Sequence, residues 1–300
     1  MTLPRGLAAY PITPSDESGK VDTSALRYLV GRLRDAKVDA IGLLGSTGSY
    51  PYLTREERRR AVEAARDEVG PQIPILVGIG SLRTDQVVKL AQDAKATGAA
   101  AGLLAAVSYQ PLTEDEVFDH FATVARESRL PICIYDNPGT SHFRFTDGLL
   151  HRLAEVDGVV ALKSPAMPSS EVADHLASLR KFVPQSFSLG YSGDWSTTDA
   201  MVAGADVWHS VLGGILPEIC LRLTAAAQSG DFNEARRLGA VLAPLWELFR
   251  EFSSVRTVYA IAEHLDLNHT SLPKPVQGLS ADVKKRLHSV LAQLPEDFTR

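Results

Sequence analysis

The strongest constraint on the fold is a series of short apolar runs that recur about every thirty residues. Glycine, proline or polar residues bound each run, which is typical of strands buried on both faces of a parallel sheet. The segments between the runs have helical patterns, so the chain predicts alternating strands and helices. The expected strands are 6–9, 40–44, 74–78, 100–105, 131–135, 159–162, 187–189 and 205–208.

Helix start signals support the same alternation. Thr54 and Glu57 have the spacing of a capping box, and they begin a helix expected to end near Val69. Helices expected over 84–97 and 113–128 also begin at a threonine. Eight such units close into a (β/α)8 TIM barrel, whereas fewer would leave an open sheet. A nucleotide-binding open sheet is disfavoured because the chain has no G-x-G-x-x-G fingerprint after a strand and no Gly-Lys-Ser/Thr motif.

The strand pattern stops after residue 216, and only helical patterns follow. These helices are expected over 217–229, 232–252, 255–265 and 279–294. We therefore predict that the chain has two parts. Residues 1–216 form a (β/α)8 barrel that carries the active site, and residues 217–300 form a C-terminal helical extension.

Composition excludes several classes of protein. The chain has 300 residues, 45% of them hydrophobic, and a net charge of −5 without a basic tract, so nucleic-acid binding is not expected. The sequence has no apolar stretch of membrane-spanning length and no signal-peptide pattern. Cys133 and Cys220 are expected to be free thiols in a reducing, cytoplasmic compartment.

Lys163 ends the apolar run that begins at Val159, and Pro165 stops the strand. A lysine at the end of a buried strand loses hydration, which lowers its pKa and makes the amine nucleophilic toward a carbonyl. The alternative is a side chain that extends past the strand end into solvent. The choice depends on which groups gather at the same face of the barrel.

Other strand ends carry compatible groups. The second strand ends in Ser46 and Thr47 between two glycines, which suits a carboxylate held by amides and hydroxyls, although a polar turn has the same pattern. Tyr109 follows the fourth strand and Tyr135 ends the fifth. A tyrosine hydroxyl both donates and accepts protons, although either tyrosine is also suited to the rim of a barrel. Together these groups predict Schiff-base chemistry on a 2-oxo acid.

Three motifs resemble the signatures of the dihydrodipicolinate synthase/N-acetylneuraminate lyase family of class I aldolases. They are 45–48 (Gly-Ser-Thr-Gly), 135–139 (Tyr-Asp-Asn-Pro-Gly) and 161–163 (Ala-Leu-Lys), and the resemblance extends over nearly the whole chain. It implies that Lys163 forms the imine and that Tyr135 moves protons.

The resemblance also implies roles for the hydroxyl cradle and for the quaternary structure. Ser46, Thr47 and Gly48 would hold the carboxylate of the 2-oxo acid, and the Thr47 hydroxyl would relay protons. Tyr109 would match a tyrosine that is lent across a tight dimer interface. Family members are usually homotetramers built from two such dimers. No cofactor is expected.

The departures from the family motifs concern the second substrate. Dihydrodipicolinate synthases have an arginine where this chain has Thr140, and a hydroxyl does not replace a bidentate arginine contact. Arg144 lies four residues further on, within reach of the same region only if its side chain turns inward. The sialic acid lyases have a threonine where this chain has Pro165, and only Asp194 of their Gly-Tyr-Asp-Glu stretch remains. The sequence therefore disfavours both substrates.

Aromatic residues near the last strand ends are further candidates. Trp195, Trp208 and His209 are expected either to line a pocket for a sugar-acid or aromatic aldehyde partner or to belong to the core. We count Thr140, Asp194 and Trp208 among the substrate-binding candidates. His209 has no second ligand at metal spacing, so no metal site is predicted.

These observations predict a lysine Schiff-base lyase acting on pyruvate or a related 2-oxo acid, by aldol cleavage or condensation or by dehydration of a 2-keto-3-deoxy acid. The alternatives are a 4-hydroxy-tetrahydrodipicolinate synthase that uses pyruvate and aspartate semialdehyde, a non-catalytic 2-oxo-acid-binding barrel, and a metal-dependent barrel aldolase. The partners expected are a small 2-oxo acid and an aldehyde, without nucleic acid or membrane.

Overall fold

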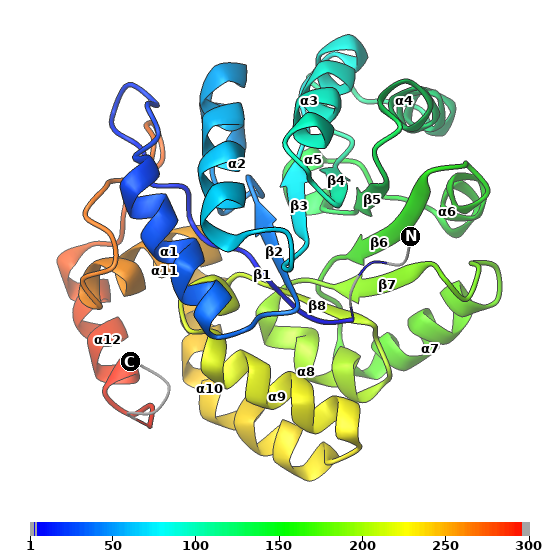
Figure 1. Cartoon of the computed structure of the whole chain (residues 1–300). Helices are drawn as coiled ribbons and strands as arrows, with labels where there is room; N and C mark the ends of the chain where they lie inside the picture. Colours follow the sequence, from blue (N-terminus) through cyan, green and yellow to red (C-terminus); the bar gives the residue numbers. More distant parts are fainter. Residues whose placement is uncertain (1–2, 4, 296–300) are drawn as a thin grey trace.

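A closed barrel of eight parallel strands forms the centre of the computed structural model, which describes residue 3 and residues 5–295 (Figure 1). Each strand pairs with the next one in sequence, and β1 pairs with β8 to close the ring. All eight expected strands and the TIM-barrel fold are confirmed. The strands are β1 Gly6–Ala9, β2 Ala40–Leu43, β3 Ile75–Gly78, β4 Ala101–Leu104, β5 Ile132–Tyr135, β6 Val159–Ser164, β7 Ser188–Tyr191 and β8 Val207–Ser210.

Helices surround the barrel, and their first residues show how the sequence positions them. The Thr54 hydroxyl accepts a hydrogen bond from the Glu57 amide, whereas the Glu57 carboxylate accepts one from Val21 instead of completing a capping box. The outer helices are α1 Thr23–Asp35, α2 Arg55–Val69, α3 Thr84–Ala96, α4 Glu114–Ser128, α6 Asp147–Ala154, α7 Ser169–Arg180, α8 Asp194–Val202 and α9 Pro217–Ser229. Three short elements, η1 Tyr50–Tyr52, α5 Pro138–Ser141 and η2 Leu212–Gly214, follow β2, β5 and β8.

The C-terminal extension consists of α10 Phe232–Phe252, α11 Ser254–His264 and α12 Ala281–Leu291. In Figure 1 these helices lie beside the barrel, and α10 packs on α8 and α9. Helix α9, which the sequence analysis placed in the extension, packs against β1 and α8 and so takes the place of the eighth barrel helix. The helical layer of the barrel therefore continues past residue 216, where the sequence analysis placed the boundary. A helical pattern alone does not show which layer a helix joins.

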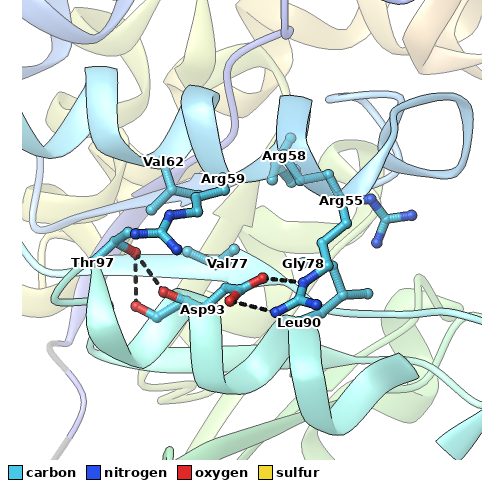
Figure 2. Close-up of a pocket in the computed structure, with 11 residues that line it drawn as sticks. Arg55, Arg58, Arg59, Val62, Val77, Gly78, Leu90, Asp93 and Thr97 are labelled. Carbon is cyan, nitrogen blue, oxygen red and sulfur yellow. Dashed lines mark hydrogen bonds and ion pairs between the residues drawn. The ribbon is translucent and has the colours of Figure 1, made fainter. Parts of the chain in front are cut away.

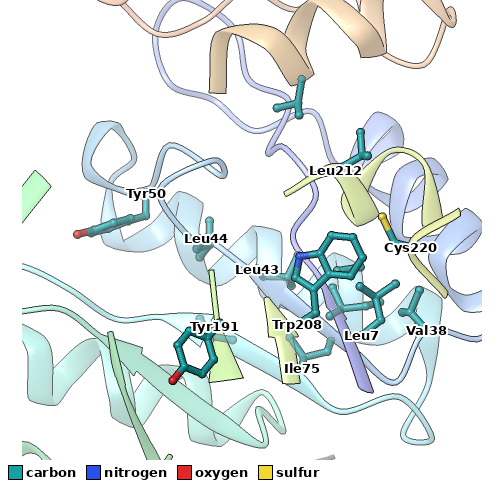
Figure 3. Packing of buried hydrophobic residues seen from close by; sticks show 14 of the residues in the cluster. Leu7, Val38, Leu43, Leu44, Tyr50, Ile75, Tyr191, Trp208, Leu212 and Cys220 are labelled. Carbon is teal, nitrogen blue, oxygen red and sulfur yellow. The ribbon is translucent and has the colours of Figure 1, made fainter. Parts of the chain in front are cut away.

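The core has two layers because successive side chains of a strand point to opposite faces. The layer inside the barrel contains small and medium side chains, among them Ala8, Ala101 and Ala161. The larger layer lies between strands and helices, and Figure 3 shows Trp208 within it beside Leu7 and near Cys220. None of the helices formed by the described residues has the length and hydropathy that a bilayer-spanning segment requires.

Candidate active site

A cavity of about 650 Å³ opens where the strands end, which is the face that carries active sites in such barrels. Residues from the ends of β1, β2, β5, β6 and β7 line its floor, and the extension contributes part of its wall. A second pocket lies between α2 and α3 (Figure 2), where Arg55 and Asp93 form an ion pair. That pocket has a volume of about 10 Å³, so it has room for a water molecule and not for a substrate.

Lys163 lies on the cavity floor, at the end of β6, and only 3% of it is exposed. Its Nζ lies 3.9 Å from the centroid of the Tyr10 ring and 4.3 Å from that of the Tyr135 ring. Two aromatic faces therefore flank the amine, and they attract its charged form less strongly than a carboxylate at ion-pair distance would.

Burial lowers the pKa of Lys163 from 10.5 to about 8, and the nearby Cys133 and Asp194 offset part of this effect. Because desolvation disfavours the ammonium, about a tenth of the amine is neutral at pH 7. The neutral amine is the form that attacks a carbonyl carbon. The environment of Lys163 thus favours nucleophilic chemistry near neutral pH.

Tyr135 is held over the lysine by contacts with the turn after β2 and with a residue that closely follows Tyr135 in the chain. Its hydroxyl lies 3.4 Å from Ser46 Oγ, and Asn137 Nδ2 donates a hydrogen bond to it at 2.9 Å. Burial raises the pKa of Tyr135 to about 12, so its hydroxyl keeps its proton at neutral pH. Because the Asn137 amide occupies one acceptor position of the Tyr135 hydroxyl oxygen, the hydroxyl proton is directed toward Ser46 or toward a ligand in the cavity.

Residues 45–49 form the turn after β2, and the expected carboxylate-holding residues lie in it. Ser46 and Thr47 both line the cavity beside Lys163. Gly48 does not line it, and its place is explained by packing, since a Cβ there would lie 2.9 Å from Thr13 Oγ1 and 3.0 Å from the Leu44 backbone. The glycine lets the turn fold back against β2 and so presents the two hydroxyl residues to the cavity.

Three other candidates occupy different environments. Tyr109 is 88% exposed on the surface and does not line the cavity. Thr140 lines the cavity, and its Oγ1 accepts a hydrogen bond of 2.6 Å from Asn137. Asp194 also borders the cavity, but its carboxylate accepts hydrogen bonds from Trp208 Nε1 at 3.0 Å and from the Leu212 amide at 2.7 Å. The Asp194 carboxylate thus holds the segment after β8 in place.

Trp208 is not placed where a substrate-binding residue was expected. It is fully buried between the strands and the helices, as Figure 3 shows, and it does not line the cavity. His209, its neighbour on β8, points to the inside of the barrel because strand side chains alternate. Of the aromatic candidates at the last strands, Trp195 alone reaches the cavity wall, with 37% of its surface exposed.

Tyr10 was missed as part of the site, and His209, which was considered as either a pocket or a core residue, is its partner. The Tyr10 hydroxyl and His209 Nδ1 lie 3.0 Å apart and buried, directly beneath Lys163. Burial lowers the pKa of His209, and the Lys163 charge lowers it further, so its ring is neutral. Tyr10 directly follows the run 6–9, so the strand-end rule that selected Lys163 also applies to it.

Among the described residues, no group of three or more His, Cys, Asp or Glu side chains is arranged to hold a metal ion. One buried lysine and several hydroxyl-bearing side chains line the cavity. A buried lysine at a strand end of such a barrel is the arrangement expected of a class I, Schiff-base-forming lyase.

Comparison with known proteins agrees with this class. Residues 3–294 match the model of the dihydrodipicolinate synthetase family. The crystal structure of dihydrodipicolinate synthase from Agrobacterium tumefaciens superposes with a TM-score of 0.95 at 49% identity, covering 97% of this chain and 98% of that one. The enzyme from Aquifex aeolicus superposes with a TM-score of 0.90 at 29% identity, over 96% and 97% of the two chains. 4-Hydroxy-tetrahydrodipicolinate synthase from Thiobacillus denitrificans is 30% identical over 277 residues, 92% of each chain.

The chain therefore belongs to the dihydrodipicolinate synthetase family, and it is a lyase of the class I aldolase type.

Proposed function

We propose that Lys163 forms an imine with pyruvate or a related 2-oxo acid, and that the enamine made from it reacts with an aldehyde. The observation that carries this proposal is the buried amine, with its pKa lowered to about 8, on the floor of a cavity at the strand ends. In the first step Nζ attacks the carbonyl carbon, and the carbinolamine then loses water. Run in the other direction, the same steps cleave a 2-keto-3-deoxy acid into the 2-oxo acid and an aldehyde. Dehydration of such an acid starts from its own imine with Lys163, which loses a C3 proton to become an enamine, and the enamine then expels the C4 hydroxyl as water after protonation.

The surrounding groups support a division of roles. Ser46 and Thr47 lie beside Lys163, where they are placed to hold the carboxylate of the 2-oxo acid. The Tyr135 hydroxyl keeps its proton at neutral pH and is suited to give it to the departing or developing oxygen. The Thr47 hydroxyl is proposed to relay protons between Tyr135 and solvent, and Gly48 supports the turn that carries it.

Borohydride reduction in the presence of pyruvate tests the proposal. Reduction converts the imine into a stable secondary amine, which peptide mass mapping locates. We expect a pyruvyl adduct on the peptide that contains Lys163 and none in Lys163→Ala. If pyruvate and a panel of other 2-oxo acids all leave the peptide unmodified, the imine proposal is wrong and a binding role without turnover gains support.

A second candidate is 4-hydroxy-tetrahydrodipicolinate synthase, which is the name that the curated relatives carry. This activity joins pyruvate to aspartate semialdehyde, whose carboxylate is bound most strongly by a cationic partner such as an arginine. Thr140 offers only a hydroxyl, and Arg144, exposed on the surface near Asp136, does not line the cavity. Assaying the purified enzyme with both substrates tests this candidate directly, and turnover comparable to that with other aldehydes would favour it.

The proposal extends to the assembly and its location. The exposed side chain of Tyr109 supports a role at a subunit interface, as the family resemblance implies. We infer a homotetramer of paired dimers in the cytoplasm. Sedimentation velocity of the purified chain tests the assembly, because a monomer at micromolar concentration would refute it.

A further inference from the structure

The outer part of the cavity differs chemically from its floor. Segments of the C-terminal extension form one side of it, with Val255 at the start of α11 and Leu272 and Val276 in the following loop. Trp195 and Tyr52 lie on the barrel side, and they are 37% and 43% exposed. Apolar side chains of the extension and two partly exposed aromatic side chains thus line the same cavity as Lys163.

The described residues that line this region offer no cationic side chain to a second substrate. Among the described residues that line the cavity, Lys163 and Asp194 are the charged ones, and the imine uses the lysine. The Asp194 carboxylate is already engaged by Trp208, Leu212 and Ser210. Ser46 and Thr47 are proposed to hold the carboxylate of the 2-oxo acid, so a second carboxylate in the outer region would lose its hydration without gaining either an ion pair or that turn.

The polar groups that remain in the outer region are neutral. Thr140, Ser192, Ser253 and Ser254 contribute hydroxyl groups, and Asn137 contributes an amide. The start of α11 also lies in this wall, but a helix N-terminus carries at most about half a unit charge and favours an anion less than an arginine does. These groups are suited to bind hydroxyl and carbonyl oxygens.

The size of the cavity also indicates the size of the ligand. A volume of about 650 Å³ lies within the range of about 300–1,000 Å³ that is usual for sites of drug-sized ligands. A three-carbon 2-oxo acid bound to Lys163 leaves most of this space for the second substrate. Burial of an apolar body against Trp195, Val255 and Leu272 would then supply binding energy.

We propose that the second substrate of this lyase is an uncharged aldehyde with an apolar body of about aromatic size, bound between Trp195 and the start of α11. The proposal rests on the proposed imine chemistry at Lys163 and goes beyond it, because it names the class of the aldehyde. In the cleavage direction the same aldehyde is the product, so the full substrate is a 2-oxo acid whose distal part is apolar and carries no second carboxylate.

The test compares aldehydes that have a carboxylate with related aldehydes that lack one. The purified full-length enzyme is assayed with pyruvate and either benzaldehyde or 4-carboxybenzaldehyde, and with either butanal or succinic semialdehyde. We expect kcat/KM to be at least about tenfold higher for the neutral member of each pair. Higher values for the carboxylated members, or no turnover of any neutral aldehyde while pyruvate imine forms, would overturn the proposal.

Borohydride trapping with pyruvate separates this result from a failure of the underlying function. If no adduct forms on Lys163, the imine proposal fails and this inference fails with it. If the adduct forms and the carboxylated aldehydes are preferred, only the assignment of the aldehyde class is wrong.

Two variants test the proposed binding position of the aldehyde. Trp195→Ala should lower kcat/KM for benzaldehyde by about tenfold or more while leaving the rate of pyruvate trapping unchanged. Thr140→Arg should raise kcat/KM for 4-carboxybenzaldehyde by about tenfold, since it supplies a cation beside the cavity. Tyr28→Ala, which removes an exposed aromatic side chain that does not line the cavity, is the matched control and should change neither value. If Trp195→Ala and Thr140→Arg both keep the wild-type preference between neutral and carboxylated aldehydes, the proposed binding position is wrong.

Discussion

Keeping Lys163 charged in a buried site should lower the stability of the folded protein. The pKa of this lysine falls from 10.5 to about 8 on folding, so the folded state disfavours the ammonium relative to the unfolded chain. At about 1.36 kcal/mol per pH unit, this difference corresponds to roughly 3 kcal/mol. Lys163→Met removes the charge and retains a side chain of similar length, so we expect the variant to be more stable at pH 7 but unable to form the imine.

The pH dependence of that stability gain follows from the two protonation states. Below pH 8 the lysine is mostly charged in both the folded and the unfolded protein, so the wild type is destabilised by nearly the whole difference of roughly 3 kcal/mol. Between pH 8 and 10.5 the folded protein has lost its proton while the unfolded chain keeps it, and the stability of the wild type rises with pH. The advantage of Lys163→Met should therefore fall from about 3 kcal/mol at pH 7 to about 1 kcal/mol at pH 9.5. Any added apolar contact of the methionine does not depend on pH.

Urea unfolding of both proteins at pH 7 and pH 9.5 measures this difference, at one fixed protein concentration so that any assembly affects both alike. Lys89→Met, at an exposed position of α3, is the matched control and should show no comparable change. A stability difference that is absent at pH 7, or that stays constant between the two pH values, would refute the reasoning that burial of a charged amine destabilises this site.

Three further predictions concern the reaction. Tyr135→Phe should leave pyruvate trapping intact but lower kcat about a hundred- to ten-thousand-fold, because the proton donor is lost; near-normal turnover would remove Tyr135 from that role. The rate of pyruvate trapping by the wild type should rise with pH and level off above about pH 8, where Lys163 becomes neutral; a rate that falls across this range would contradict it. Tyr10→Leu should lower the midpoint of that pH profile by about half to one pH unit, because it removes an aromatic face that stabilises the Lys163 ammonium. Tyr10→Phe keeps an aromatic ring and should leave the midpoint unchanged. If Tyr10→Leu has the same midpoint as the wild type, the Tyr10 ring does not stabilise the ammonium.

Much of the fold could be predicted because its signals are local. Short apolar runs bounded by glycine and proline gave all eight strands, and threonines at helix starts marked α2 and α4. The position of α9 was harder to predict, because its pattern shows only that it is helical. Whether it joins the barrel depends on contacts with β1 and α8, which lie far from it in sequence.

The cavity lining was predictable where a candidate side chain ends a strand, as Lys163 and Tyr135 do. Trp208 and His209 were considered together, although neighbours on a strand face opposite sides and cannot both line one cavity. The structure places Trp208 outside the barrel and His209 inside it. The wall contributed by the extension could not be derived, because no local pattern in residues 249–276 indicates that this segment reaches the strand ends.

Glycines explain how the barrel interior has room for the aromatic groups around Lys163. A Cβ at Gly42 would lie 2.2 Å from the Tyr10 ring, and one at Gly190 would lie 2.5 Å from His209 Nε2. Neither position can take a larger residue while Tyr10 and His209 keep their places. The Tyr10 ring in turn sets the surroundings of the Lys163 amine. Glycines on β2 and β7 thus make room for the aromatic pair beneath the Lys163 amine.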